Sequence, residues 1–432
     1  MEPSQGGSTK RTLIFLVAIL VAGLISFLAG KAALADHRSH SQTPADWLRA
    51  AELEPGNGDY WERLGMFREY DFDHSDPYLA IQYYRKALEN NPWSDLYWMN
   101  LASAYEIVGD TAHAREAYKR AQAVYPISAE VAWNNGNFFL RQSQFDQGFA
   151  EIRRAMATDP TLIPLAISRC WRSTRDVDRL LSELLPAEVD SYFQTLDFLV
   201  KSQESDAAQV VWKSLLALRK PFPLSRSFPY LGYLIQEDQA DEAKNVWAQA
   251  IAASGWPYAA PPDNFVVWNG GFEYEIANGG FDWVEDQITG ALMGVDTTNP
   301  HSGKRSLRVD FTGSSNLDFH HVSQVVAVKP LTHYHFRAYM RTEEISTESG
   351  PCFVIYDPHH LNELLVRTAD LTGTQPWTPL EVDVTTGPQT HVLLIQLRRL
   401  QSRLFDNKLS GTVWVDDVSL IPSLEAPVQT SQ

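Results

Sequence analysis

The chain has 432 residues, enough for two or three domains that each bury their own hydrophobic core. Its formal net charge of −17 argues against a nucleic-acid partner, because such a partner requires clustered Lys and Arg to replace its counterions. The two cysteines, Cys170 and Cys352, fall in different predicted domains, so two buried thiols are expected rather than a disulfide.

The N-terminal segment has the composition of a membrane span. Residues 12–30 carry no charge and are mostly apolar, close to the roughly 20 residues that a spanning helix needs. Lys10 and Arg11 precede this segment, which predicts a cytoplasmic N-terminus and places the rest of the chain outside the cytoplasm. The alternative is a cleaved signal peptide, since Ala33-Leu34-Ala35 resembles a small-residue cleavage site. The length of the apolar run and Lys31 before that site favour an uncleaved anchor.

A pattern of small and aromatic residues recurs between residues 80 and 160 with a period of 34. Its three copies are Ala80, Tyr84, Ala87 and Pro92; Ala114, Tyr118, Ala121 and Pro126; and Gly148, Ile152, Ala155 and Pro160. A fixed period of this size is typical of stacked helical hairpins, each of which buries its apolar face only against its neighbours. The pattern predicts an all-α solenoid.

The residues before each copy resemble the opening half of the tetratricopeptide repeat, W-x2-L-G-x2-Y. They are Trp61, Leu64 and Gly65; Trp98, Leu101, Ala102 and Tyr105; and, more weakly, Ala132, Asn135, Gly136 and Phe139. The first copy is three residues longer than the second, and we assign the insertion to the polar run 71–77 between its two helices.

In tetratricopeptide domains the first helix of each hairpin lines a groove that binds an extended peptide. The resemblance therefore implies a set of partner-binding residues on these helices: Glu62, Met66, Met99, Glu106, Trp133, Asn137 and Arg141, with Asp59, Glu69, Tyr70 and Ser103 on the same faces. Asn137 occupies a position at which related domains often use asparagine to hold a peptide backbone. The lysine pair and second asparagine of the carboxylate-clamp type are absent, so no capture of a C-terminal carboxylate is expected. The alternative is that these faces are the solvated surface of spacer repeats.

Helical character continues in weaker form after Pro160. The stretches "SDAAQVVWKSLLAL" and "ADEAKNVWAQAIAA" are similar to each other and place Trp212 and Trp247 at equivalent positions 35 residues apart. A tryptophan at helical spacing is far more often a packing residue than a ligand site, so we expect both in the core of degenerate hairpins.

Beyond a proline-rich boundary at 256–263 the helical period gives way to alternation. The stretch "SLRVDF" at 306–311 places Leu307, Val309 and Phe311 on one face, and "HYHFRAYMRT" at 333–342 alternates in the same way. About nine to eleven short strands separated by Gly, Pro and Asn turns predict an antiparallel sandwich.

Residues 265–422 resemble the jelly-roll carbohydrate-binding modules appended to xylanases and glucanases. The motifs that carry this resemblance are "NGGFE" at 269–273, "GGFDW" at 279–283, "HSGKRSLRV" at 301–309, "VSQVVAVKP" at 322–330 and "GTVWVDDVSL" at 411–420. The resemblance implies a jelly-roll sandwich with a glycan-binding face.

The same resemblance implies one structural calcium ion where the first and last strands meet. Asp416 alternates in step with Trp414, Val418 and Leu420, which predicts that its carboxylate faces the core, where an unpaired charge is costly. Glu273 lies in the opening strand, and a shared Ca²⁺ would satisfy both carboxylates. The alternative is that backbone N–H groups do so.

A glycan surface needs exposed rings that stack on sugar CH faces and polar groups that orient the hydroxyls. The candidates for carbohydrate binding are Trp283, Tyr339 and Trp377, with Arg337, Arg341, Gln396 and Arg398 as polar neighbours on outward strand positions. The alternative is ordinary surface packing.

No catalytic arrangement appears in the sequence. Asp416 and Asp417 are adjacent on a strand and face opposite sides, so they cannot form a glycosidase carboxylate pair. The histidine doublets lack acids or cysteines at metal-ligand spacing. We therefore expect a non-enzymatic protein.

The sequence thus predicts a membrane-anchored protein of a bacterial inner membrane with its domains in the periplasm. Its repeats would dock a protein and its sandwich a polysaccharide, in exopolysaccharide or surface-glycan assembly; the alternative is a purely structural protein that binds no sugar. The predicted segments are the cytoplasmic N-terminus (1–11), the anchor (12–30), a linker (31–45), repeats (46–162), degenerate repeats (163–256), the jelly roll (265–422) and a disordered tail (423–432).

Overall fold

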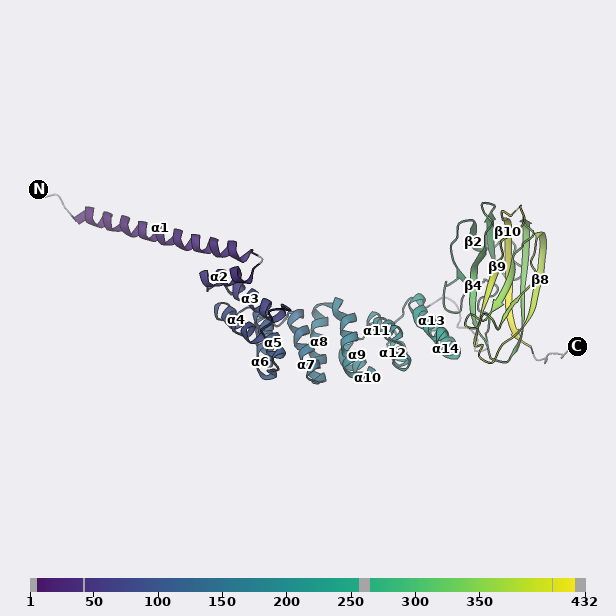
Figure 1. Cartoon of the computed structure of the whole chain (residues 1–432). Coiled ribbons are helices and arrows are strands. Elements are labelled where there is room, and N and C mark those ends of the chain that lie inside the picture. The colour runs from purple at the N-terminus through teal and green to yellow at the C-terminus, as the bar shows by residue number, and fades with distance from the viewer. Residues whose placement is uncertain (1–5, 42, 256–264, 406, 424–432) are drawn as a thin grey trace. The chain divides into compact units, whose positions relative to one another are not determined.

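The computed structural model describes residues 6–41, 43–255, 265–405 and 407–423 (Figure 1). The chain divides into two compact units, Met1–Pro186 and Ala187–Gln432. The proline-rich boundary predicted at 256–263 lies outside the described residues, as does the predicted tail except for Ser423.

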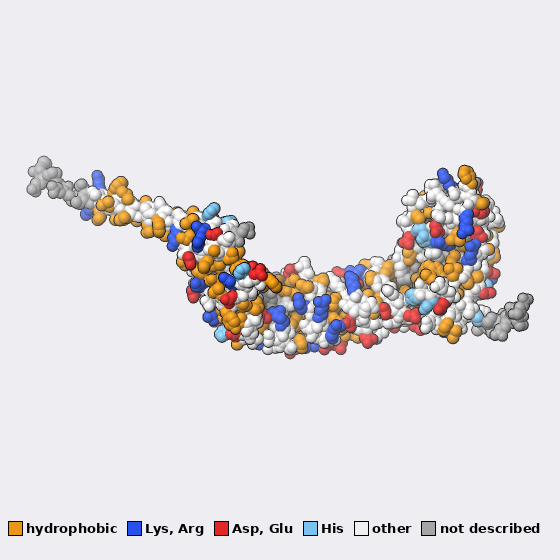
Figure 2. Space-filling view, in the orientation of Figure 1, with side chains coloured by type: hydrophobic (Ala, Val, Ile, Leu, Met, Phe, Trp, Pro, Cys, Tyr) orange, Lys and Arg blue, Asp and Glu red, His pale blue; other side chains and the backbone are white. Residues whose placement is uncertain are grey.

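One long apolar helix, α1 (Gly6–Ser39), opens the first unit. Within it an 18-residue window of Lys10–Ser39 reaches a mean hydropathy of 2.8, and Figure 2 shows hydrophobic side chains along the surface of the helix. By length and composition this helix can serve as a membrane anchor or as a signal sequence. It continues into the predicted linker, where Ala35 and Ser39 are buried and Arg63 donates a hydrogen bond to the Ser39 carbonyl (2.5 Å). The helix α2 (Pro44–Leu53) follows, with Thr43 as its N-cap.

Three helical hairpins follow in the first unit, as the 34-residue period predicts. Their helices lie side by side in Figure 1: α3 (Gly58–Tyr70) with α4 (Pro77–Asn90), α5 (Asp95–Ile107) with α6 (Thr111–Val124), and α7 (Ala129–Arg141) with α8 (Phe145–Thr158). Six residues join α3 to α4, whereas three join the helices of each later hairpin, so the predicted insertion is confirmed.

The residues at the repeated positions of the 34-residue pattern form the contact between the two helices of each hairpin. Tyr84, Tyr118 and Ile152 are buried in successive second helices. Glycine in the first helix admits two of them: a Cβ on Gly65 would lie 2.4 Å from the ring of Tyr84, and one on Gly136 would lie 2.7 Å from Ile152. The small residues of the sequence pattern are therefore required by close helix packing.

The remaining helices complete the α-helical part of the chain. The first unit ends with η1 (Pro160–Leu162), α9 (Ile163–Thr174), α10 (Val177–Arg179) and η2 (Leu180–Leu184). The second unit begins with α11 (Val189–Lys201), α12 (Ser205–Ala217), η3 (Leu224–Ser227), α13 (Phe228–Gln236) and α14 (Ala240–Ser254). Trp212 and Trp247 are buried in α12 and α14, which confirms their assignment to the core.

The rest of the second unit is a sandwich of two antiparallel sheets, as predicted. One sheet has the strand order β1-β4-β9-β6-β7 and the other the order β2-β3-β10-β5-β8. We call them sheet A and sheet B. The strands of sheet A are β1 (Val284–Glu285), β4 (Phe319–Ala327), β9 (Val392–Arg399), β6 (Cys352–Tyr356) and β7 (Leu365–Arg367). Those of sheet B are β2 (Ala291–Asp296), β3 (Ser306–Thr312), β10 (Ser410–Pro422), β5 (His333–Ile345) and β8 (Gly373–Thr385).

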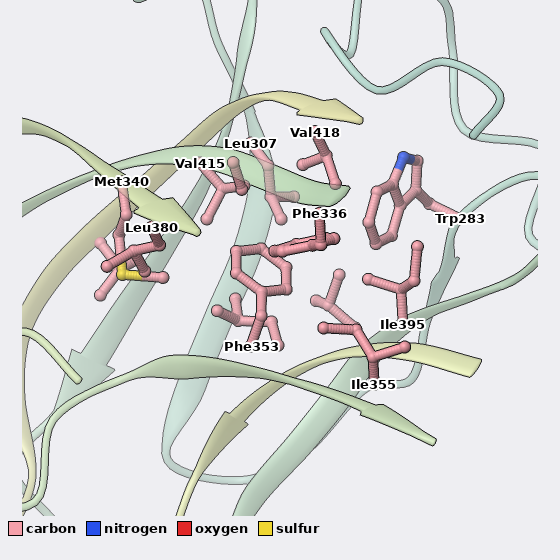
Figure 3. Close-up of a cluster of buried hydrophobic side chains, with 14 of the residues drawn as sticks. Trp283, Leu307, Phe336, Met340, Phe353, Ile355, Leu380, Ile395, Val415 and Val418 are labelled. Carbon is pink, nitrogen blue, oxygen red and sulfur yellow. The ribbon is translucent and has the colours of Figure 1, made fainter. Parts of the chain in front are cut away.

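The inner faces of both sheets form one hydrophobic core, part of which Figure 3 shows. Leu307, Val309 and Phe311 of β3 belong to it, as their alternation predicts. Phe336 and Met340 of β5 lie there as well. The two cysteines are free and buried, which confirms the expectation of two separate thiols.

Within the second unit the last helices pack directly on the sandwich. Phe228 and Trp247 lie over Gly279 and Gly280, where added Cβ atoms would each come within 2.4 Å of a ring carbon. Lys244 Nζ also donates a hydrogen bond to the Phe265 carbonyl (2.8 Å). The sequence did not predict this contact, because the change from helical to alternating period indicates a boundary and not which residues meet across it.

Candidate functional site

The inner faces of α3, α5 and α7 line a cavity of about 600 Å³. Five of the groove residues expected from the sequence contribute to it: Tyr70, Met99, Ser103, Glu106 and Arg141. Further lining comes from residues that were not predicted, which are Leu96, Asn100, Ile107, Tyr118, Glu130 and Asn134. We call this cavity the repeat groove.

Several apolar side chains of the repeat groove are exposed to solvent. Tyr70 is 63% exposed, Leu96 44% and Ile107 52%, although all three lie on helices whose other faces are buried. Met66, on the same face of α3 as Tyr70, is 43% exposed. A run of exposed apolar side chains inside a concave surface is typical of a binding groove.

Ion pairs and hydrogen bonds fix the charged groups of the repeat groove. Arg141 on α7 holds Glu106 on α5 through bidentate hydrogen bonds of 2.8–2.9 Å. Tyr118 donates a further hydrogen bond to Glu106 Oε1 (2.8 Å). Glu69 is 5% exposed and accepts hydrogen bonds from Tyr84 (2.6 Å) and Ser103 (2.5 Å). The groove is thus built from hydrogen bonds that connect successive hairpins.

The other predicted partner-binding residues lie beside the cavity or away from it. Asn137 is buried and does not line the cavity, and its amide donates to the Trp133 carbonyl within its own helix (2.8 Å), so its contact with a peptide backbone stays a prediction. Trp133 is half-buried and does not line the cavity. Glu62 accepts a hydrogen bond from Asn100 (2.8 Å), and burial raises the pKa of its carboxyl group.

The predicted glycan-binding residues do not form one surface. Arg337, Tyr339 and Arg341 alternate with core residues on β5, so with Trp377 of β8 they lie on the outer side of sheet B. Gln396 and Arg398 alternate with core residues on β9, so they lie on the outer side of sheet A. Strand alternation identified outward positions, but it did not reveal that these positions belong to opposite faces of the sandwich.

Trp283 is fully buried and cannot stack on a sugar. Its ring packs in the core near Phe336, Ile395 and Val418 (Figure 3), and its indole N–H donates to the Asn269 carbonyl (3.1 Å). The prediction of an exposed ring at this position is therefore wrong. The ring sits next to the two-residue strand β1, a segment too short for alternation to reveal its inner face.

An aromatic cluster lies on the outer side of sheet B. His301 stacks on Tyr339 with 3.7 Å between ring centroids and meets Trp377 edge-on at 5.6 Å. Asp417 orients the imidazole through a contact of 2.6 Å between its Oδ2 and Nδ1 of His301. Tyr339 and Trp377 are both half-buried. His301 was not predicted, because nothing in the sequence shows that its loop covers β5.

Two arginines of sheet B flank a buried tryptophan. The guanidinium groups of Arg308 and Arg341 lie 5.4 and 4.6 Å from the ring centroid of Trp414. Of the other polar candidates, Arg337 pairs with Glu381 (2.5 Å) and Arg398 with Asp318 (3.0 Å). Gln396 donates to the His320 carbonyl (3.2 Å). These partners hold the polar side chains in fixed positions.

Asp416 is fully buried, but it does not face the core of the sandwich. The pairing of β10 with β5 is irregular between Asp416 and Ser419, and Asp417 adopts a positive φ of 50°. This bulge shifts the alternation by one residue, so Val415 and Val418 both point inward. Asp416 remains on the outer side with Trp414, and the predicted direction of its carboxylate is wrong.

Backbone N–H groups satisfy the two carboxylates that were expected to share calcium. Asp416 accepts from the N–H groups of His301 (2.8 Å), Ser302 (3.0 Å) and Asp417 (2.7 Å), although burial raises the pKa of its carboxyl group. Glu273 Oε1 accepts from Lys304 (2.7 Å) and Arg305 (3.2 Å). Among the described residues no three His, Cys, Asp or Glu side chains are grouped so that they could hold a metal ion. Calcium at this position stays a prediction.

No protein-family model matches the chain, and no curated protein matches it either. Solved structures do resemble its parts. One is reported as the crystal structure of MamA, with 15% identity over 40% of this chain and 85% of that chain and a TM-score of 0.26. Another is a CBM4 domain, with 15% identity over 36% of this chain and 99% of that chain and a TM-score of 0.27. A third is a xylan-binding domain from CBM22, with 12% identity over 38% of this chain and 100% of that chain and a TM-score of 0.27.

Proposed function

We propose that this chain is a non-enzymatic, membrane-anchored envelope protein whose helical repeats bind an extended segment of a protein partner. The observation that carries the proposal is the repeat groove, in which exposed Tyr70, Leu96 and Ile107 lie beside the fixed ion pair of Glu106 and Arg141. Apolar side chains supply contact area for a bound segment, while held polar groups supply its orientation.

The groove is tested with a photo-reactive amino acid introduced at Ile107 in the full chain. Ile127 serves as the matched control, because it is 71% exposed and does not line the groove. We expect one defined protein to be cross-linked from position 107 and not from position 127. Arg141→Glu should abolish the cross-link by placing two carboxylates in contact. Equal cross-linking from both positions would show that the repeat groove is not the binding site.

A second binding function belongs to the outer side of sheet B. The observation that favours it is the contact cluster of His301, Tyr339 and Trp377, with Arg337 and Arg341 on the same strand as Tyr339. Aromatic rings beside oriented polar groups suit the CH faces and hydroxyls of a sugar. We propose that this cluster binds a polysaccharide of the envelope.

Affinity electrophoresis of the full chain in detergent, through gels that contain different soluble polysaccharides, tests this second site. We expect one glycan class to retard the protein and Trp377→Ala to abolish the retardation. Phe405→Ala is the matched control, because Phe405 is a fully exposed aromatic residue of the sandwich outside the cluster. Unchanged mobility of the folded protein in every gel would favour the alternative of a purely structural sandwich.

In its most specific form, the proposal places α1 in a bacterial inner membrane, the remaining domains in the periplasm, and the protein in exopolysaccharide or surface-glycan assembly. The support is that one chain combines an apolar N-terminal helix with a groove suited to a protein and a cluster suited to a sugar. Protease protection of the C-terminal part in intact cells, lost when the outer membrane is opened, tests the orientation.

A further inference from the structure

A second pocket, of about 470 Å³, lies between α4, α5 and α6. Its apolar lining comes from Leu88, Pro92, Trp98, Leu101 and Ala117, and it shares no lining residue with the repeat groove. On α5 the residues that line the two cavities alternate at helical spacing, so the pocket and the groove lie on different faces of that helix. We call it the outer pocket.

An exposed tryptophan stands at the edge of the outer pocket. Trp93 is 80% exposed and follows Pro92, which lines the pocket. Its turn is held in place, because the Trp93 N–H donates to Asn91 Oδ1 (3.2 Å) and the Trp98 indole donates to the Pro92 carbonyl (3.0 Å). A large aromatic side chain held out in solvent beside an apolar pocket marks an interaction surface.

The rim of the outer pocket carries both charge signs. Arg85 and Glu89 are one helical turn apart on α4, yet they do not pair with each other. Arg85 instead donates to the hydroxyl of Tyr105 (3.1 and 2.5 Å), which leaves the Glu89 carboxylate without an ion pair in the part of the chain that the structure describes. Two further titratable residues line the pocket, but each has a partner: Glu116 pairs with Arg120 (3.1 Å) and His113 contacts Asp110 (2.7 Å). Arg85 and Glu89 are therefore the cation and the anion that the rim offers to a partner of complementary charge.

We propose that the occupant of the outer pocket is Trp93 of a second copy of this chain. A two-fold contact joins the same patch on both copies, so the patch must be complementary to itself. This patch meets that condition in shape, because a projecting indole and an apolar pocket adjoin. It meets the condition in charge as well, because Arg85 of each copy would face Glu89 of the other. The repeat groove stays free in such a dimer.

Sedimentation equilibrium of the full chain in density-matched detergent tests the proposal, because the detergent then adds nothing to the buoyant mass. We expect a reversible monomer–dimer equilibrium. Trp93→Ala should raise its dissociation constant by at least about tenfold, the effect of removing a central aromatic anchor. Phe72→Ala is the matched control, since Phe72 is 98% exposed in the neighbouring loop and does not line the pocket; it should leave the constant unchanged.

Charge reversal distinguishes the two-fold contact from a loss of folding. Arg85→Glu and Glu89→Arg should each weaken the dimer, and the double variant should restore it because the pair is re-formed across the interface. A monomer at every soluble concentration would overturn the proposal. So would a dimer that survives Trp93→Ala, because association would then reside in α1 or on another surface. Capture of Trp93 by an unrelated protein would equally replace the second copy as the occupant.

Discussion

Tyr84 of α4 donates its hydroxyl proton to the buried carboxylate of Glu69 on α3, with 2.6 Å between the two oxygen atoms. The next hairpin repeats this contact between Tyr118 and Glu106. Burial raises the pKa of both tyrosines, so each hydroxyl remains a donor. In the third hairpin the equivalent positions are occupied by Leu140 and Ile152, which form an apolar pair in place of a hydrogen-bonded one.

This relationship predicts a non-additive pair of substitutions. Tyr84→Phe removes a side-chain donor from buried Glu69, and should lower the free energy of unfolding by about 1–3 kcal/mol. The double change Glu69→Leu with Tyr84→Ile copies the third hairpin and should cost less than the sum of its single changes. Urea unfolding of the full chain measures both. Tyr78→Phe, an exposed tyrosine of the same helix, is the control; equal costs for Tyr78 and Tyr84 would contradict the prediction.

Helix packing in the first hairpin depends on the absence of a side chain at residue 65. Gly65→Ala would place a Cβ 2.4 Å from the Tyr84 ring, and the two helices must separate to admit it. We expect a loss of about 1–3 kcal/mol in unfolding free energy, the usual range for overpacking. Gly56→Ala is the matched control, since among the described residues no atom beyond its own chain neighbours lies within 4 Å of its added Cβ. Thermal unfolding measures both variants. Equal melting temperatures would contradict the close packing of residue 65 against the Tyr84 ring.

The buried carboxyl group of Asp282 should make the folding stability of the second unit depend on pH. Burial raises the pKa of this carboxyl group to about 6, from 3.8, although it accepts hydrogen bonds from the N–H groups of Ala277 and Trp283. Between about pH 4 and 6 the folded protein therefore retains a proton that the unfolded chain has released. Stability should fall as pH rises through this window, by about 3 kcal/mol for this residue.

Chemical unfolding at pH 4.5 and pH 7 measures this dependence. Asp282→Asn cannot titrate, so its loss of stability between the two pH values should be smaller than that of the unchanged protein. Asp286→Asn serves as the control, because Asp286 is exposed and its removal should leave the slope unaltered. A slope that is the same in the Asp282 variant would show that other groups cause the dependence.

The calcium prediction is tested by its effect on stability. If Ca²⁺ binds between Glu273 and Asp416, a concentration 100 times the dissociation constant stabilises the folded state by about 2.7 kcal/mol. EDTA should then lower the melting temperature of the full chain, and Glu273→Gln should remove the difference between Ca²⁺ and EDTA. Asp383→Asn changes an exposed carboxylate and should preserve it. Identical melting curves in Ca²⁺ and EDTA would contradict the calcium site and favour the backbone N–H groups as the partners of both carboxylates.

Periodicity predicted those features that repeat along the chain. The 34-residue columns identified the buried contacts of Tyr84, Tyr118 and Ile152, because each hairpin repeats the same packing. Strand alternation identified the inner residues of β3 and β5 for an equally regular reason. In both cases one local rule, applied many times, determines which side chains are buried.

Features that depend on a single irregularity or on tertiary pairing could not be predicted in this way. The bulge at Asp417 shifts the alternation of β10 once, and that shift alone places Asp416 on the outer side. Which sheet a strand joins is decided by pairing between distant segments, so Gln396 and Tyr339 could not be assigned to opposite faces. The role of His301 arises from a loop that reaches β5 only in the folded sandwich.

The last helices and the sandwich cannot be separated without exposing the contact between them. In this contact Phe228 and Trp247 pack on Gly279 and Gly280. Neither glycine can acquire a side chain without displacing a ring, and Gly280 also holds a positive φ of 63°. A gene fusion joined in the proline-rich segment would transfer the sandwich without the rings that cover it. The portion that can be exchanged between proteins as an intact piece therefore begins near Ala187, and the last helical hairpins must accompany the sandwich.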